Sequence, residues 1–212
     1  MEPRDCTTGG DLLRTGLSEE ELDVVVAGID AIWRGHALAL PDVVAERPEL
    51  AADVLGTLAD AGRAEIDEEG RLVGVHGFSL HETRHGIVGD GATHHVWCGF
   101  DSVGIPAAFR LDAVAVTDCP TCGKALSVDI SGGVPADSEI VLWLPVPEGT
   151  THLMQQFCAS ADLYCSRAHL EDHVDTTTVA GRILDLAEAA ALGRETWADV
   201  AHADLSAGAV AR

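Results

Sequence analysis

In the first third of the chain, the spacing of the hydrophobic residues changes once, from that of helices to that of strands. Ser18 and Glu21 have the spacing of a helix capping box. The apolar residues that follow recur at helical spacing, at Leu22, Val25, Val26, Ile29 and Ile32. A second helix is expected to start at 41–42 and a third to run over 48–62, after which residues 63–75 have the pattern of strand, turn and strand. Three helices and a two-stranded wing predict a winged-helix-like module over residues 1–76.

Residues 77–212 follow mostly the period of strands. Asp90-Gly91 indicates a hairpin turn between strands at 77–88 and 92–97, and a short helix is expected over 98–109. Further elements are expected as strands at 113–117, 125–130 and 140–144, a strand ending near residue 158, a helix at 166–173 and a last helix at 178–192. The fold class predicted is α+β, with the winged-helix-like module packed on a mixed or antiparallel β core with flanking helices.

Charge and composition exclude several classes of function. The chain has 212 residues, 35 acidic against 13 basic side chains, a net charge of −22 and 47% hydrophobic residues. This composition supports a globular core but lacks the basic surface needed to bind phosphates, so neither nucleic-acid binding nor attraction to an anionic membrane is expected. The first ten residues contain no apolar stretch typical of a secretory signal, so a cytoplasmic location is expected.

Six cysteines carry most of the candidate chemistry: Cys6, Cys98, Cys119, Cys122, Cys158 and Cys165. In a reducing compartment thiols act as metal ligands, nucleophiles or inert core residues more often than as disulfides. Cys119-Pro-Thr-Cys122-Gly has the form of a zinc knuckle, but the neighbouring sequence offers no two further ligands. A structural zinc ion at Cys119 and Cys122 is therefore kept as an alternative to a reduced turn, which we favour, and Cys165 is expected to be a buried, inert thiol.

His81-Glu-Thr-Arg-His85 matches the H-E-x-x-H motif of zinc proteases. That chemistry requires a helix, which places both histidines on one metal ion. Here the surrounding glycines favour an extended strand, in which residues four apart lie too far from each other, at about 13 Å, to share a zinc ion. We therefore expect no zinc protease site.

Trp97-Cys98-Gly-Phe-Asp101 is the most informative segment. A cysteine that begins a helix faces unpaired backbone N–H groups, which lower the pKa of a thiol and favour the thiolate. Asp101 lies one turn further on the same helical face. The sequence thus predicts a soft nucleophile beside a carboxyl group.

The flanking residues extend this pattern to a known family. Gly77-Phe-Ser-Leu80, Thr83, His85, Val88, Asp90-Gly91, Trp97-Cys98, Asp101 and Pro106 together resemble the core of the organomercurial (alkylmercury) lyase family. Cys119-Pro, Phe157-Cys158 and Gly181-Arg182, the last placed in the final helix, continue the resemblance. It covers about residues 18–192, includes the N-terminal module, and implies a catalytic core at 77–212.

The resemblance implies protonolysis of the carbon–mercury bond by Cys98, Cys158 and Asp101. Mercury is soft and prefers thiolates, so both cysteines would bind it and Asp101 would deliver a proton to carbon, releasing a hydrocarbon and Hg(II). No organic cofactor is expected; the partners implied are an organomercurial substrate and small thiols or a mercuric-ion-accepting protein. A non-catalytic soft-metal binding or sensing protein is the alternative.

The sequence departs from the family pattern at several positions near this segment. His94-His95 replace aromatic and aliphatic residues, Gly104-Ile105 replace bulkier ones, and Glu82 replaces a frequent proline. A pocket of different size and polarity is therefore expected. Both histidines are expected to face solvent.

Overall fold

The computed structural model describes residues 16–146, 152–203 and 205. Cys6 and the first ten residues, on which the absence of a secretory signal was argued, lie outside this part of the chain. The helices are α2 (Glu19–Trp33), α3 (Pro48–Asp60), α4 (Gly99–Phe109), α5 (Arg167–His173) and α6 (Leu186–Thr196), with a 3-10 helix η1 (Leu40–Asp42) and a π-helical turn η2 (Met154–Cys158). The strands are β1 (Leu38–Ala39), β2 (Ala64–Ile66), β3 (Arg71–Val75), β4 (Phe78–Ser79), β5 (His85–Gly89), β6 (Ala92–Val96), β7 (Ala113–Asp118), β8 (Ala125–Ser131), β9 (Val134–Pro135), β10 (Val141–Pro145), β11 (Asp162–Tyr164) and β12 (Gly181–Leu184).

The N-terminal segment forms two of the three expected helices. Ser18 caps α2 through a capping box with Glu21, and α3 ends just before Gly62, whose φ of +64° suits a helix C-terminus. The expected second helix is wrong, because the chain makes only the 3-10 helix η1 there. The β2–β3 hairpin forms as predicted. With one helix reduced to a short turn, the winged-helix assignment is not confirmed.

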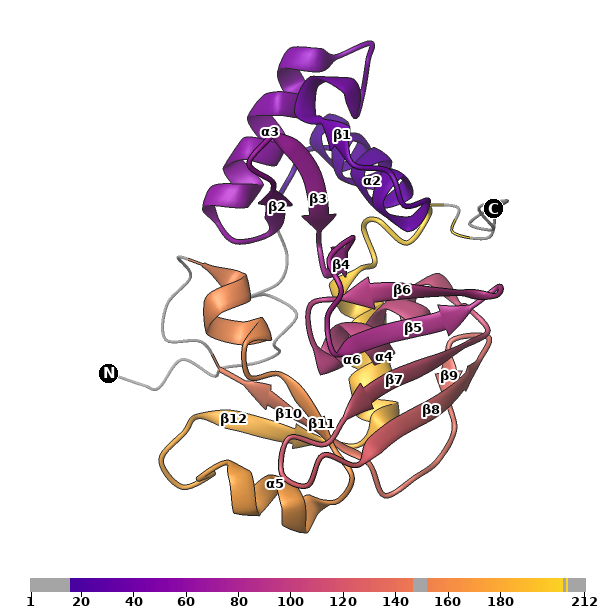
Figure 1. Ribbon diagram of the computed structural model, residues 1–212, viewed down its shortest axis with the longest axis vertical. Helices are drawn as coiled ribbons and strands as arrows, with labels where there is room; N and C mark the ends of the chain where they lie inside the picture. The colour runs from indigo at the N-terminus through magenta and orange to yellow at the C-terminus, as the bar shows by residue number, and fades with distance from the viewer. Residues whose placement is uncertain (1–15, 147–151, 204, 206–212) are drawn as a thin grey trace.

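An antiparallel sheet contains nine of the twelve strands in the described part of the chain. Its order is β1-β3-β4-β6-β5-β7-β8-β9, and β2 pairs with β3 outside this path. The sheet crosses the expected boundary at residue 76, since Gly74 on β3 pairs with Ser79 on β4. The division into 1–76 and 77–212 stays a prediction. In Figure 1 α2, α3 and β1–β3 form the upper part, with the β5–β8 region below them.

A second, three-stranded sheet with the order β11-β10-β12 lies beside the first. Two expectations for this region of the chain are wrong. The strand expected to end near Cys158 is the π-helical turn η2, and the first part of the expected last helix is β12, which pairs with β10. Asp185 explains the second error, because it caps α6 with Glu188 and so starts the helix at Leu186, eight residues later than expected.

Helix α4 lies in the centre of the molecule. Residues from Gly99 to Ala107 are all buried, and α6 packs along the helix more extensively than any other element does. Gly104 permits this approach: a Cβ atom there would lie 2.7 Å from the Trp197 ring and 3.2 Å from the Gly193 Cα. Figure 1 shows both helices behind the β5–β8 region. Within the described residues no helix is long and apolar enough to cross a bilayer.

Candidate active site

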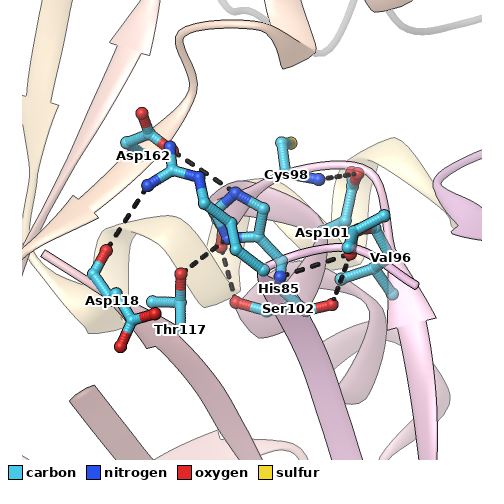
Figure 2. Close-up of polar contacts among 11 residues, drawn as sticks. His85, Val96, Cys98, Asp101, Ser102, Thr117, Asp118 and Asp162 are labelled. Atoms are coloured by element: carbon cyan, nitrogen blue, oxygen red, sulfur yellow. Dashed lines mark hydrogen bonds and ion pairs between the residues drawn. The ribbon is translucent and has the colours of Figure 1, made fainter. Parts of the chain in front are cut away.

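Cys98 occupies the N-cap of α4. Strand β6 delivers the chain to Trp97, and Cys98 then adopts an extended backbone with φ −149° and ψ 174°. Cys98 and Asp101 form a reciprocal capping box, in which the Cys98 N–H donates to Asp101 Oδ2 at 3.0 Å. Figure 2 shows the carboxyl group of Asp101 turned toward this backbone nitrogen. The spacing predicted from the sequence is thus confirmed as one helix turn.

Cys158 reaches the same place from a distant part of the chain. It ends the turn η2, and the ring of the preceding Phe157 packs edge-on against Phe100, with centroids 6.0 Å apart. Gly99 brings this segment close: its N–H donates to the Ala161 carbonyl at 2.8 Å, and a Cβ atom there would lie 2.8 Å from a backbone nitrogen of β11. The lack of a side chain at Gly99 therefore allows the 158–163 segment to lie against the start of α4.

The three predicted site residues form one buried cluster. The Sγ atoms of Cys98 and Cys158 and a carboxylate oxygen of Asp101 lie within 4.8 Å of one another. Cys98 is fully buried, and Asp101 and Cys158 are 4% and 9% exposed. The structure thus brings together two soft ligands and one acid/base group in a site largely closed to water.

Burial changes the protonation of all three groups. Desolvation raises the pKa of Asp101 to about 7, against the hydrogen bonds to Cys98 and Trp97, which lower it. Desolvation, the contact with Cys158 and the charge of Asp101 together raise the pKa of Cys98 well above its usual range. The expectation that the helix N-terminus lowers the pKa of Cys98 is therefore wrong, because burial outweighs the effect of the N–H groups.

Cys158 is the more easily ionised of the two thiols. The hydrogen bond from Cys98 lowers the pKa of Cys158, although burial and the charge of Asp101 together leave it raised. The same contact raises the pKa of Cys98. Both thiols of the pair are therefore protonated at neutral pH.

Two cavities meet at Cys158. An open hollow of about 190 Å³ is lined by Glu65, Ser79, His81, Thr83, Trp97, Met154, Cys158 and Ala159. A smaller cavity of about 20 Å³ lies on the side of Asp101, with Trp197 and His76 in its wall. Cys158 is accessible from the hollow, whereas Cys98 lines neither cavity.

Three residues that shape this site were not predicted as site residues from the sequence. Gly77 has a φ of +95°, and a Cβ atom there would lie 2.9 Å from the Asp101 Cγ. His76 Nε2 is buried, and no hydrogen-bond partner for it is found among the described residues. Glu65 accepts a hydrogen bond from Trp97 Nε1 at 2.7 Å. Gly77 belonged to the family resemblance, but no local signal marks His76 or Glu65, which lie more than 20 residues before Cys98.

The H-E-x-x-H segment does not form a helix, which confirms the prediction. Residues 81–84 are irregular, and His85 begins β5. His85 instead joins a polar network in Figure 2: its Nδ1 lies 2.8 Å from the Thr117 hydroxyl and its Nε2 lies 3.4 Å from Asp162 Oδ1. Arg84 pairs with the same carboxylate. Together these residues tie β11 to the large sheet.

The remaining histidine and cysteine expectations are corrected. His94 does not face solvent freely; it stacks on Trp33 with ring centroids 3.5 Å apart, and burial lowers its pKa to about 4. His95 accepts a hydrogen bond from the Thr83 N–H at 3.3 Å. Cys165, expected to be buried and inert, is half-buried and lies 2.9 Å from His169 Nδ1.

Comparisons with known proteins relate the chain to one family. The family model described as alkylmercury lyase (MerB) matches residues 78–198. Proteins named alkylmercury lyase are similar to the chain: one from Bacillus cereus is 24% identical over 76% of this chain and 74% of its own length. Another, from Staphylococcus epidermidis, is 26% identical over 77% and 76%. The crystal structure of the mercury-bound form of MerB2 superposes with a TM-score of 0.79 at 20% identity, covering 90% of this chain and 96% of that one.

A buried pair of thiols beside a carboxyl group on a mixed α+β fold defines a thiolate site suited to a soft metal. The family match extends over more than half of the chain and contains this site. The chain belongs to the alkylmercury lyase family, as its sequence motifs indicate.

Proposed function

We propose that this protein cleaves the carbon–mercury bond of organomercurials by protonolysis, with Cys98, Cys158 and Asp101 as its catalytic and mercury-binding residues. One observation carries the proposal: two thiols and one carboxyl group lie within 4.8 Å of one another in a buried site of a lyase-family member. The carboxyl group distinguishes this proposal from simple metal storage, because a storage site requires only the thiols.

The substrate first meets Cys158. This thiol lines the open hollow and is the more easily ionised of the pair. Attack of its sulfur on R–Hg–X forms the bond from Cys158 to mercury and releases X, which leaves with the thiol proton as HX. The hollow of about 190 Å³ is smaller than typical drug-sized pockets of about 300 Å³ or more, which favours a short alkyl chain or a single ring as the organic group.

Cys98 then becomes the second mercury ligand and supplies the proton that carbon needs. Coordination to mercury acidifies a thiol whose pKa burial otherwise raises. Asp101, with a pKa near 7, accepts that proton and delivers it to carbon as the carbon–mercury bond breaks. The overall change is two thiols and R–Hg–X giving R–H, HX and mercury held between Cys98 and Cys158. Asp101 returns to its starting state.

Turnover requires that mercury leave the two sulfurs. Small thiols or a mercuric-ion-accepting protein are the acceptors we propose, since only another thiolate competes well for Hg(II). A reducing compartment such as the cytoplasm both supplies such thiols and keeps Cys98 and Cys158 reduced. No organic cofactor takes part in the scheme.

The test is release of arene from an arylmercury salt in the presence of excess small thiol. Many turnovers per protein molecule support the proposal. Binding of mercury without release of arene would instead support the non-catalytic metal-binding alternative. Asp101→Asn keeps the size of the side chain but cannot transfer the proton, so it should bind mercury with both thiols and release no arene. A variant that retains parental turnover would remove Asp101 from the mechanism.

A further inference from the structure

A second group of metal-ligating side chains lies outside the active site. It consists of Cys119 and Cys122 on the turn between β7 and β8, Cys165 directly after β11, and His169 on α5. Their Sγ atoms and one ring nitrogen all lie within 4.8 Å of one another. Cys165, 43 residues after Cys122, and His169, 50 residues after Cys119, thus provide the two ligands that the local sequence of the knuckle lacks.

The spacing of these atoms fits a tetrahedral zinc ion. Zinc–sulfur bonds of about 2.3 Å and zinc–nitrogen bonds of about 2.0 Å place neighbouring ligand atoms about 3.5–3.8 Å apart. Cys122 and Cys165 have their sulfurs 3.9 Å apart, and Cys119 Sγ lies 3.9 Å from His169 Nδ1. The Cys165 to His169 distance of 2.9 Å needs to open by only about half an ångström.

The backbone around the group is already shaped for a metal. The Gly123 N–H donates to the Cys119 carbonyl at 2.8 Å, and Gly123 has a φ of +69°, which closes the knuckle turn. Backbone N–H groups of Cys165, Cys122 and Thr121 point at the Cys119 sulfur. The backbone of the turn is thus arranged around the sulfur that would bind the ion.

A histidine ligand is also held in place. The His169 N–H donates to the Ser166 hydroxyl at 3.3 Å, which caps α5, and the Thr121 hydroxyl donates to the His169 carbonyl. The knuckle and α5 are therefore connected independently of a metal. A disulfide between Cys122 and Cys165 would not involve Cys119 or His169, whereas one zinc ion would be bound by all four side chains.

We propose that Cys119, Cys122, Cys165 and His169 bind one zinc ion as a structural Cys3His site. Binding displaces the remaining thiol protons to solvent, and exposed Cys122 gives the metal access from solution. The ion would tie the β7–β8 turn to the end of β11, the strand that lies against Gly99 beside Cys98. The site would thereby hold the two halves of the active site together without touching the substrate.

The test is the zinc content of the full-length protein, purified under reducing conditions without chelators and never exposed to mercury. About one zinc ion per chain is expected. Cys122→Ser and His169→Gln should each weaken zinc binding at least about 100-fold in competition with a chromophoric chelator. Cys122 is exposed, so its replacement by serine opens no cavity in the core, and far-UV circular dichroism of the variant checks that it is folded when zinc binding is measured. The control is the Cys98→Ser, Cys158→Ser double variant, which should keep its zinc.

Cobalt(II) provides a second readout. The parent and the control should show the thiolate charge-transfer and tetrahedral d–d bands of a sulfur-rich site, and Cys122→Ser should lose them. Zinc at background in the parent, together with no cobalt spectrum after reconstitution, would overturn the proposal. Zinc that persists in Cys122→Ser but disappears from the double variant would also overturn it. So would a Cys122–Cys165 disulfide in protein purified under reducing conditions.

Discussion

Replacing Asp101 with asparagine should make the protein more stable above neutral pH while removing its activity. The carboxyl group has a pKa of about 7 in the folded protein and 3.8 as its ordinary value. The folded state therefore binds this proton more tightly than the unfolded state does. The cost of the buried charge is absent at low pH, grows as the pH rises from about 4 to 7, and is complete above pH 7.

The magnitude follows from the pKa difference. Each pH unit between the two pKa values costs about 1.4 kcal/mol, so between pH 5 and pH 8 this group removes about 3 kcal/mol from the free energy of unfolding. Asparagine carries no charge, and its side-chain oxygen can still accept from the Cys98 N–H. The advantage of Asp101→Asn over the parent should thus grow by about 3 kcal/mol from pH 5 to pH 8.

Urea unfolding of the reduced, mercury-free protein at several pH values measures this difference. Asp129→Asn, which removes an exposed carboxyl group on β8, is the matched control and should follow the parent at each pH. A gap between Asp101→Asn and the parent that stays constant from pH 5 to pH 8 would refute the reasoning. It would mean that Asp101 is ionised in the folded protein throughout this range.

Three further predictions concern arene release by variants of the protein. Cys98→Ser and Cys158→Ser should each remove nearly all arene release, because a hydroxyl is a poor ligand for mercury; an active variant of either kind would exclude a two-thiol mechanism. Gly77→Ala should lower stability by about 1–3 kcal/mol and reduce turnover in the folded fraction, measured by unfolding and by arene release, because its Cβ displaces Asp101. Cys122→Ala should lower thermal stability through loss of the zinc ion but keep turnover within a few-fold of the parent where it is folded. A folded Cys122→Ala variant that binds no mercury at Cys98 and Cys158 would contradict the placing of the reaction at these two thiols.

The parts of the fold that the sequence predicted correctly depend on local signals. The capping box at Ser18, the hairpin at Asp90-Gly91 and the helix after Cys98 each have their determinants within a few residues. The errors arise where contacts with distant parts of the chain decide the local secondary structure. The residues of β12 have a helical pattern but pair with β10 instead, and Cys158 ends a π-helical turn whose Phe157 packs against α4.

The candidate site divides in the same way. Its three residues could be named from short motifs and a family resemblance, and the structure brings them together. The protonation of Cys98 could not be predicted, because a helix N-terminus lowers the pKa of a thiol only if burial does not outweigh it. The partners of the knuckle were equally hidden, since Cys165 and His169 approach Cys119 only after β11 has packed beside β7 and α5 beside β11.

The sequence by itself determined the class of chemistry: which side chains are candidate nucleophiles, and that a carboxyl group follows Cys98 by one helix turn. Only the tertiary structure decided how Cys98 and Cys158 meet, that Asp101 holds its proton near pH 7, and that four more ligands gather at the knuckle. The physical reason is that residue identity and helix spacing are local properties of the chain. The burial of an ionisable group and the approach of ligands to one another depend instead on which distant segments of the chain pack together and exclude water there.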